Sequence, residues 1–369
     1  MKKILFLIHD LGHGGAEKVL VNLVNNLDRT KFDVSVTALF GGGVNEQFLK
    51  PDVHYRAVFP RMIPGNSHLM KLLSPKQLHR LCVKGRYDIE VSYLEGPSAR
   101  VISGCGDSET KLVSWIHSTT HSETHLSKSF RSLSEARGCY RRFDASVFVS
   151  QWTRDAFLSF CDVKNPLILY NTNESAQILE KAAHPAEHEK FPCDGFHWCG
   201  VGKLTPNKGF DRMIRIQSRL RQAGFDSRLL ILGEGEERPK LEALAVSEGV
   251  ADSVMFLGYQ TNPYKYVSKC DLFVCASHSE GFSTAATEAL IVGTPVCTVE
   301  VSGMKEMLGE HNEWGIVTEN DEEALYQGIK GLLEDPSRLA YYKEKAIERG
   351  KDFSTEETVR AVENMLLSL

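Results

Sequence analysis

Apolar runs alternate regularly with amphipathic segments in the first half of the chain. Strand-like runs such as 3–8 and 89–94 are almost uninterrupted in apolar residues, and segments with apolar positions at helical spacing, such as 16–27, lie between them. Continuous apolar strands that alternate with helices are typical of a parallel sheet covered on both faces. We therefore expect residues 1–172 to form one doubly wound, Rossmann-like α/β domain.

The same alternation restarts after a polar interval. Residues 173–195 are rich in Glu, Lys, His and Pro and contain no strand-like run, so we predict a linker there. Strand and helix patterns then alternate over 196–350, which predicts a second doubly wound α/β domain. Residues 351–369 are expected to form a helix that packs back toward the first domain. Because ligands bind at the carboxyl ends of parallel strands, we expect the two domains to face each other across a binding cleft.

Composition narrows the class of protein without identifying it. Of 369 residues, 42% are apolar and 25% charged, which are ordinary globular values that disfavour disorder. The sequence contains no run of 18 apolar residues, so no transmembrane helix is expected. The start of the chain lacks a small-residue cleavage site, and the nine cysteines include no CxxC. These features favour a reducing cytoplasm and no structural zinc.

Charge is distributed unevenly between the two halves. Residues 1–175 contain 22 Lys and Arg against 17 Asp and Glu, a balance of +5, and residues 176–369 contain 21 against 31, a balance of -10, which together give the net charge of -5. A basic half and an acidic half suggest different partners for the two domains.

The first candidate motif is the glycine turn Gly12-His13-Gly14-Gly15, directly after the first predicted strand. Glycines there let backbone N–H groups and a helix N-terminus approach an anion or a sugar. Glu17 stands where a dinucleotide fingerprint would have its third glycine, so NAD is disfavoured. A tight turn without a ligand is an equally good interpretation.

A second glycine-rich loop carries two lysines. Lys203 and Lys208 follow a predicted strand in the segment from Gly202 to Gly209, and both could converge on a diphosphate. Two solvated lysines beside a turn would give the same pattern. Gly233 and Gly235, at the end of the next predicted strand, shift the balance toward a binding loop.

The third motif opens a helix after another predicted strand. Glu280 and Gly281 lie at the turn, Ser283 and Thr284 begin the helix, and Glu288 follows one turn later among alanines. A phosphate could bind the free N–H groups of the helix N-terminus while Glu288 accepts hydrogen bonds from sugar hydroxyls. The alternative makes the two carboxylates a helix cap and a structural group, but a carboxylate on a packed face needs partners.

His117 ends another predicted strand, where it could reach a cleft, although a lone histidine is more often structural. No cluster of His, Cys and Asp has metal-ligand spacing, and the sequence contains no DxD, GxSxG or GxxxxGK[ST]. A metal-dependent diphosphate site, a serine hydrolase and a P-loop protein are therefore disfavoured.

Together these motifs resemble one family. The Gly14-Gly15 turn, the two-lysine loop, Gly233-Glu234-Gly235, the EX7E pattern from Glu280 to Glu288 and Pro295-Val296 are similar to those of family 4 retaining glycosyltransferases, group 1, which have the GT-B fold. The motifs occur in order over nearly the whole chain. The EX7E block with the two-lysine loop is fairly specific, whereas the glycine turn is weak.

The resemblance assigns a role to each matching position. It implies that Lys203 and Lys208 hold a diphosphate, that Glu280 contacts the transferred sugar, that Glu288 binds ribose hydroxyls and that His117 lies near the scissile bond. The implied donor-binding residues are Gly14, Gly15, Gly202, Gly233, Gly235, Gly281, Phe282, Ser283, Thr284 and Glu288; no metal and no separate cofactor is implied. The chain departs from the family at Lys203, where Arg is frequent, and at Ser302-Gly303-Met304, where a glycine pair is frequent.

The resemblance implies transfer of a hexose-type sugar from a nucleotide diphosphate, UDP by default, to a hydroxyl of a glycan or lipid-linked acceptor in surface polysaccharide biosynthesis. No nucleic-acid partner is expected. Alternatives are an epimerase or phosphorylase of GT-B type and a non-catalytic sugar-nucleotide-binding protein. The basic, apolar segments 68–81 and 128–143 are consistent with peripheral binding to the inner face of the cell membrane, or with ordinary surface helices with snorkelling lysines.

Overall fold

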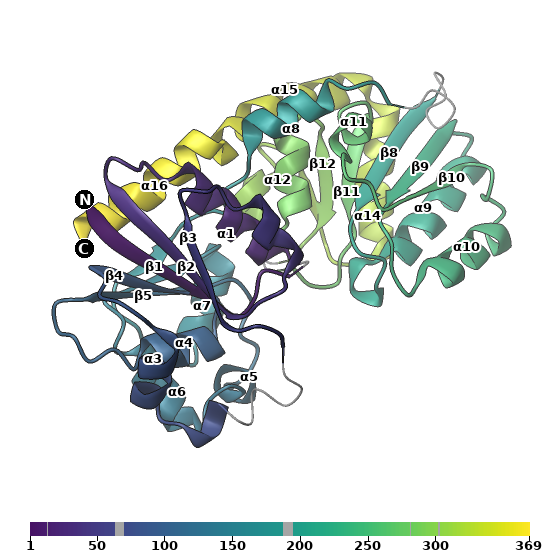
Figure 1. Ribbon diagram of the computed structural model, residues 1–369. Helices are drawn as coiled ribbons and strands as arrows, with labels where there is room; N and C mark the ends of the chain where they lie inside the picture. The colour runs from purple at the N-terminus through teal and green to yellow at the C-terminus, as the bar shows by residue number, and fades with distance from the viewer. Residues whose placement is uncertain (13, 63–69, 187–194, 281, 302) are drawn as a thin grey trace. The chain divides into compact units, whose positions relative to one another are not determined.

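The computed structural model describes residues 1–12, 14–62, 70–186, 195–280, 282–301 and 303–369. These residues form two compact units, Met1–Asn173 together with Thr355–Leu369, and Glu174–Ser354. Each unit contains one parallel sheet with helices packed on it (Figure 1). The predicted fold class, two parallel-sheet α/β domains, is therefore confirmed.

The first unit is built on a sheet of order β3-β2-β1-β4-β5-β6-β7. Five consecutive residues of β1, an inner strand of this sheet, from Ile4 to Ile8, are fully buried. Its strands are β1 (Lys2–Ile8), β2 (Phe32–Phe40), β3 (His54–Phe59), β4 (Ile89–Tyr93), β5 (Lys111–Ile116), β6 (Ala145–Phe148) and β7 (Pro166–Ile168). Its helices are α1 (Gly15–Asn26), α3 (Pro75–Cys82), α4 (Pro97–Ile102), α5 (Glu123–Ser127), α6 (Leu133–Tyr140), α7 (Gln151–Leu158) and α16 (Thr355–Ser368), with a 3-10 turn at Val44–Phe48.

The second unit is built on a sheet of order β10-β9-β8-β11-β12-β13. Its strands are β8 (Phe196–Val201), β9 (Ser227–Leu232), β10 (Val254–Gly258), β11 (Leu272–Cys275), β12 (Val296–Val299) and β13 (Ile316–Thr318). Its helices are α8 (Ser175–Ala182), α9 (Phe210–Gln222), α10 (Arg238–Ser247), α11 (Tyr264–Val267), α12 (Thr284–Ile291), α13 (Met304–Leu308), α14 (Glu322–Glu334) and α15 (Pro336–Gly350), with 3-10 turns at Pro206–Lys208 and Lys351–Phe353.

Both sheets reverse their strand order at one point. The reversal lies between β1 and β4 in the first unit and between β8 and β11 in the second. In open parallel sheets the loops on either side of such a point separate at the carboxyl ends of the strands and leave room for a ligand. We therefore expect each unit to bind its ligand at the loops that follow these strands.

Part of the segment predicted to be a linker, residues 173–195, is a helix. Ser175–Ala182 forms α8, a helix of the second unit that contacts α11 and α12. Ile178 is buried there, and Asn262 and Ser268 donate hydrogen bonds to the last carbonyl groups of α8. Packing and capping by distant residues thus outweigh the polar local composition. Residues 187–194 lie outside the described residues.

Two further differences concern helix boundaries in the first unit. Residues 123–142 form two helices, α5 and α6, in place of one continuous helix, because Ser132 caps a new helix by accepting a hydrogen bond from the N–H of Glu135. The sequence analysis also missed α4, a short helix that begins at Pro97.

The C-terminal helix α16 belongs to the first unit. Glu363 accepts hydrogen bonds from the backbone N–H of Asp28 at 2.7 Å and from Lys31 Nζ at 2.8 Å. The helix begins at Thr355, since residues 351–353 form a 3-10 turn of the second unit. Within the described residues, no helix combines the length and the apolar character needed to cross a membrane.

Candidate functional site

The second unit pairs a lysine with a glutamate at its strand-order reversal. Lys208 ends the 3-10 turn after β8, and Glu280 lies in the loop after β11. Lys208 Nζ is 2.6 Å from Glu280 Oε1, and the hydroxyl of Ser277 donates to the same oxygen at 2.6 Å. The Glu280 side chain is only 12% exposed, so a carboxylate with little access to water is held by a cation and a hydroxyl.

Backbone contacts fix the two loops against each other. The N–H of His278 donates to the carbonyl of Asn207 at 2.8 Å, and the Asn207 side-chain amide donates to the carbonyl of Ser279 at 2.8 Å. Gly209 has φ +66, and a Cβ there would lie 2.1 Å from the carbonyl oxygen of Ala276. Glycine is therefore needed at 209 for this close approach, which sets the position of Lys208.

The glycines predicted for donor binding have a structural reason of their own. Gly233 has φ +149, and a Cβ there would lie 1.9 Å from the carbonyl oxygen of Gly202. A Cβ on Gly235 would lie 2.2 Å from the carbonyl oxygen of Leu204. The backbone N–H of Leu204 in turn donates a hydrogen bond to the backbone carbonyl oxygen of Glu234. These glycines let the loops after β8 and β9 pack backbone to backbone.

Lys203 and Lys208 differ in their surroundings. Lys203 is exposed and makes no ion pair with the residues that the structure describes, whereas Lys208 is paired with Glu280. The stem of Lys208 passes Gly202, where a Cβ would lie 3.7 Å from Lys208 Cδ.

Helix α12 carries the remaining predicted residues of this unit. Ser283 is its N-cap and accepts a hydrogen bond from the N–H of Ala286 at 3.4 Å, and Thr284 is its first residue. Phe282 is buried, with its ring 6.0 Å from that of Phe353. Gly281 lies outside the described residues.

Glu288 is partly buried on α12 and has a tyrosine partner. The hydroxyl of Tyr264, the first residue of α11, donates to Glu288 Oε1 at 3.0 Å. This contact orients the carboxylate from a neighbouring helix. A small cavity of about 20 Å³ is lined by Lys208, Ser277, Glu280 and Ser283 among others, which is room for about one water molecule.

The predicted site residues of the first unit lie at one edge of its sheet. Gly14 and Gly15 follow β1 and begin α1, and His117 follows β5; their strands are separated only by β4. A Cβ on Gly15 would meet nothing within 4 Å, so this position borders open space, whereas one on Gly14 would collide with the carboxylate of Glu17. His13 lies outside the described residues.

His117 is held by a glutamate that the sequence analysis did not identify. Glu95, two residues beyond β4, accepts hydrogen bonds from the backbone N–H of His117 at 3.0 Å and from the hydroxyl of Ser118. The His117 ring lies 4.7 Å from the ring of Tyr93. Its Nε2 is buried without a hydrogen-bond partner among the described residues. Burial lowers the pKa of His117 to about 3, so the imidazole is neutral at physiological pH.

Ser277, Tyr264 and Glu95 are thus additions to the predicted site. Ser277 and Glu95 each follow a predicted strand, so the signal used for His117 could have found them. Tyr264 has no such signal, because only the packing of α11 near α12 brings its hydroxyl to Glu288.

Two family models match the chain. The model of glycosyl transferases group 1 matches residues 187–349, and that of glycosyltransferase family 4 matches residues 13–171. The chain is 30% identical, over the full length of both proteins, to an N-acetylgalactosamine-N,N'-diacetylbacillosaminyl-diphospho-undecaprenol 4-alpha-N-acetylgalactosaminyltransferase of Campylobacter jejuni. It is 26% identical to the lipopolysaccharide core biosynthesis mannosyltransferase LpsB of Rhizobium meliloti, over 62% of this chain and 67% of that protein.

Solved structures with the same fold cover the whole chain. Alr3699/HepE of Anabaena, crystallised in complex with UDP, has a TM-score of 0.77 at 20% identity and is matched over 100% of both chains. Sucrose-phosphate synthase of Thermosynechococcus elongatus has a TM-score of 0.78 at 19% identity, over 100% of this chain and 99% of that one. These likenesses agree with the two parallel-sheet units, and with the family models they show that the chain is a glycosyltransferase of family 4 with the GT-B fold.

Proposed function

We propose that this glycosyltransferase moves a hexose-type sugar from a nucleoside diphosphate to a hydroxyl of a glycan or lipid-linked acceptor, with retention of the anomeric configuration. The observation that carries the proposal is the group formed by Lys208, Glu280 and Ser277 at the strand-order reversal of the second unit. It combines a cation for a diphosphate with an oriented carboxylate for a sugar.

The difficult event in this reaction is departure of a diphosphate that gains negative charge. Lys203 and Lys208 would stabilise that charge as it develops, together with the free N–H groups at the start of α12. The lysines and the lack of a DxD motif in the sequence favour a reaction in which side chains, without a metal ion, neutralise the leaving group. Glu288, oriented by Tyr264, would accept hydrogen bonds from the two ribose hydroxyls.

The donor is proposed to be a UDP-sugar. The Anabaena protein with the same fold was crystallised with UDP, and the Campylobacter relative is named for transfer of N-acetylgalactosamine. An N-acetylhexosamine is therefore the first sugar to test, and no separate cofactor is proposed.

A lipid-linked acceptor is favoured by the relative's name and by the surface of the first unit. The Campylobacter enzyme acts on a sugar attached to diphospho-undecaprenol. An acceptor of this kind stays in a membrane, so the enzyme has to work at the membrane surface.

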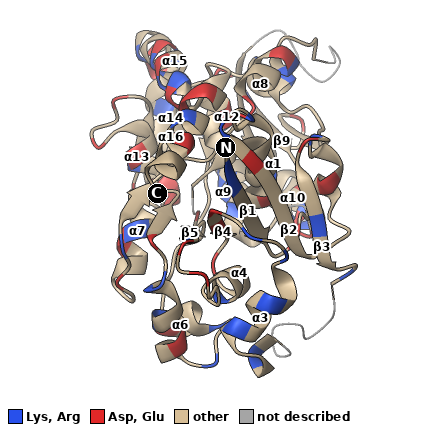
Figure 2. Ribbon diagram, turned by 60° about the vertical axis from the view of Figure 1, so that its left-hand side comes forward, with Lys and Arg blue, Asp and Glu red and all other residues tan. Residues whose placement is uncertain are grey.

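Helix α3 presents a basic face with apolar residues beside it. The ribbon of α3 carries Lys and Arg positions, which are blue in Figure 2. Lys76, Arg80 and Lys84 are exposed on or directly after this helix, and Leu81 between them is 44% exposed. From residue 70 to residue 86 the sequence has no Asp or Glu. A basic face with exposed leucines fits the headgroup region of an anionic bilayer.

The second basic segment marked in the sequence adjoins the first. The guanidinium group of Arg131 donates to the carbonyl oxygens of Lys71 at 2.6 Å and Leu72 at 2.7 Å, and Leu72 is 75% exposed. The two segments therefore form one surface. This continuity supports the interpretation that they bind a membrane together over the interpretation that they are ordinary, unconnected surface helices. Residues 68 and 69 of the first segment lie outside the described residues.

A transfer assay with defined donors tests the reaction. The full chain is incubated with UDP-N-acetylgalactosamine, UDP-N-acetylglucosamine, UDP-glucose or UDP-galactose and an α-linked N-acetylhexosamine acceptor on a polyprenyl diphosphate. We expect one donor to give a glycosylated product whose new linkage is α by NMR. A β linkage would refute retention, and UDP-sugar epimerisation without acceptor would refute transfer.

Vesicle sedimentation tests the membrane surface separately. The chain should sediment with phosphatidylglycerol vesicles at low salt and not with phosphatidylcholine vesicles. Lys76→Glu/Arg80→Glu should abolish sedimentation, whereas the charge-matched variant Lys240→Glu/Lys269→Glu in the second unit should not. Equal sedimentation of both variants would reject the basic face of α3 as the docking surface.

A further inference from the structure

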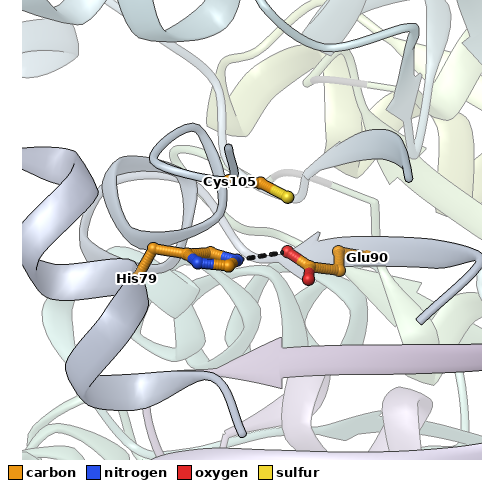
Figure 3. Close-up of side chains that lie close together, drawn as sticks. All are labelled: His79, Glu90 and Cys105. Carbon is orange, nitrogen blue, oxygen red and sulfur yellow. Dashed lines mark hydrogen bonds and ion pairs between the residues drawn. The ribbon is translucent and has the colours of Figure 1, made fainter. Parts of the chain in front are cut away.

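Three potential metal ligands meet inside the first unit, away from the predicted site. His79 lies on α3, Glu90 on β4, and Cys105 just after α4. One nitrogen, oxygen or sulfur atom from each lies within 4.8 Å of the others, and His79 Nε2 is 2.8 Å from Glu90 Oε2. Figure 3 shows the imidazole, carboxylate and thiol converging on one point.

The group is buried and lies in the interior of the sheet. Glu90 is 2% exposed on β4, which pairs with β1 and β5 on its two sides, and Cys105 is 3% exposed. A carboxylate at such a position is costly unless a cation or strong donors balance it. In the described part of the chain, His79 is the residue seen to contact the Glu90 carboxylate.

The backbone around the three ligands is held in place by close packing. A Cβ on Gly104 would lie 2.0 Å from the carbonyl oxygen of Pro75, so the chain before Cys105 passes directly against the start of α3. Arg142 Nη2 donates to the carbonyl oxygen of Cys105 at 2.7 Å. The thiol and the imidazole are therefore presented by segments that pack on each other, which preorganises the site.

We propose that His79, Glu90 and Cys105 form a structural Zn²⁺ site. Nitrogen, carboxylate oxygen and thiolate sulfur are the ligand types that zinc takes in proteins, and around a tetrahedral ion such atoms lie roughly 3–4 Å apart. The 2.8 Å between His79 and Glu90 is shorter than this spacing and the other separations reach at most 4.8 Å, so the side chains would have to shift slightly to admit the ion. His79 is the most exposed of the three, and its side is where water would complete the tetrahedron.

The proposed ion has no part in sugar transfer. Glu90 is the second residue of β4, whereas the predicted site lies beyond the carboxyl end of that strand, roughly 10 Å further along it. The ion would clamp α3 to the sheet. The proposal departs from the sequence-based expectation of no structural zinc, because the three ligands come from separate elements and have no recognisable local spacing.

Metal analysis of the tag-free full chain tests the site directly. We expect about one zinc per chain after extensive dialysis without chelator. Cys105→Ser and His79→Gln should bind zinc more than about 100-fold more weakly. Cys161→Ser, which changes another buried cysteine of the same unit, should bind it as the unmodified chain does. Loss of zinc with the native circular dichroism spectrum retained separates ligation from folding.

Cobalt binding to the unmodified chain provides a test that needs no variant. After zinc removal, one equivalent of Co²⁺ should give a thiolate-to-cobalt charge-transfer band and visible bands of tetrahedral intensity, and should restore the melting temperature lost with zinc. A zinc-free chain that shows no such bands, or zinc retained equally by both ligand variants, would overturn the proposal and leave a buried histidine–glutamate pair.

Discussion

Lys208 Nζ and Glu280 Oε1 are 2.6 Å apart, although 72 residues separate them in the sequence. The contact joins the loop after β8 to the loop after β11, so the cation and the carboxylate form one electrostatic unit. A group that binds Lys208 changes the charge environment of Glu280, and the reverse also holds. The two side chains should therefore not act independently.

The first prediction is that the effects of substituting Lys208 and Glu280 are not additive. Lys208→Ala and Glu280→Gln should each lower kcat by about 10²–10³, because each removes a group proposed to act in the transition state. The double variant should lose less than the product of the two factors. Steady-state kinetics of the two single variants and the double variant, with the donor that supports transfer, measures this non-additivity as a double-mutant cycle. Lys240→Ala, at an exposed lysine of the same unit, should keep full activity.

Normal turnover of Lys208→Ala would remove the basis of the proposed reaction. Fully additive losses would instead show that the contact between Lys208 and Glu280 has no role in the working enzyme.

The second prediction concerns recognition of the ribose by Glu288. Glu288→Gln should raise the donor KM about tenfold or more, because it replaces a charged hydrogen-bond acceptor, and should change kcat less. Tyr264→Phe should raise KM by a smaller factor, since it only removes the donor that orients the carboxylate. The decisive measurement compares UDP with 2′-deoxy-UDP as inhibitors. The unmodified chain should prefer UDP, and Glu288→Gln should lose most of that preference.

A preference for UDP that survives in Glu288→Gln would assign the ribose contact to another residue.

The third prediction is that glycine at position 233 stabilises the second unit. Gly233→Ala should lower the free energy of unfolding by about 2–4 kcal/mol, because the new Cβ would collide with the carbonyl oxygen of Gly202 in a backbone conformation unfavourable to alanine. Gly249→Ala is the matched control, since Gly249 also has positive φ, +70, but open space around its Cβ. Gly249→Ala should lower the free energy of unfolding by roughly 1 kcal/mol. Urea titration followed by tryptophan fluorescence measures both.

Equal costs for the two alanine variants would mean that conformation alone, and not the close approach of the two loops, decides the choice of glycine at 233.

The fourth prediction follows from the buried imidazole of His117. Burial lowers its pKa to about 3, so the folded chain keeps this ring neutral while the unfolded chain protonates it near its ordinary value of 6.5. The contribution of the neutral His117 ring to the stability of the fold is therefore present above pH 6.5, and it is lost as the pH falls from there toward 3. The NMR signals of the His117 ring should therefore not titrate between pH 8 and pH 5.

His117→Asn should also reduce the acid sensitivity of folding. Between pH 6.5 and pH 5 the unmodified chain should lose about 2 kcal/mol more stability than this variant, at roughly 1.4 kcal/mol per pH unit. Titration of the His117 ring near pH 6.5 would contradict its burial.

The sequence by itself determined the two-sheet architecture and most of the motif positions. Uninterrupted apolar strands such as Ile4–Ile8 can only be buried on both faces, which implies a parallel sheet with helices around it. Because strands of a parallel sheet share a direction, residues just after them, such as Lys208 and Glu280, could be assigned to one edge. The motifs also carried the family resemblance, which the comparisons confirm.

Only the tertiary structure decided which residues contact each other across separate elements. The sequence does not show that Ser277 shares Glu280 with Lys208, that Glu95 holds His117, or that α8 is a helix capped by Asn262. The same is true of the fully buried Arg100, whose guanidinium group donates to the carbonyl oxygens of Met70 and Leu73 and pairs with Glu135. Local periodicity reports the face on which a residue lies, whereas hydrogen bonds and ligand sets depend on how distant faces are brought together.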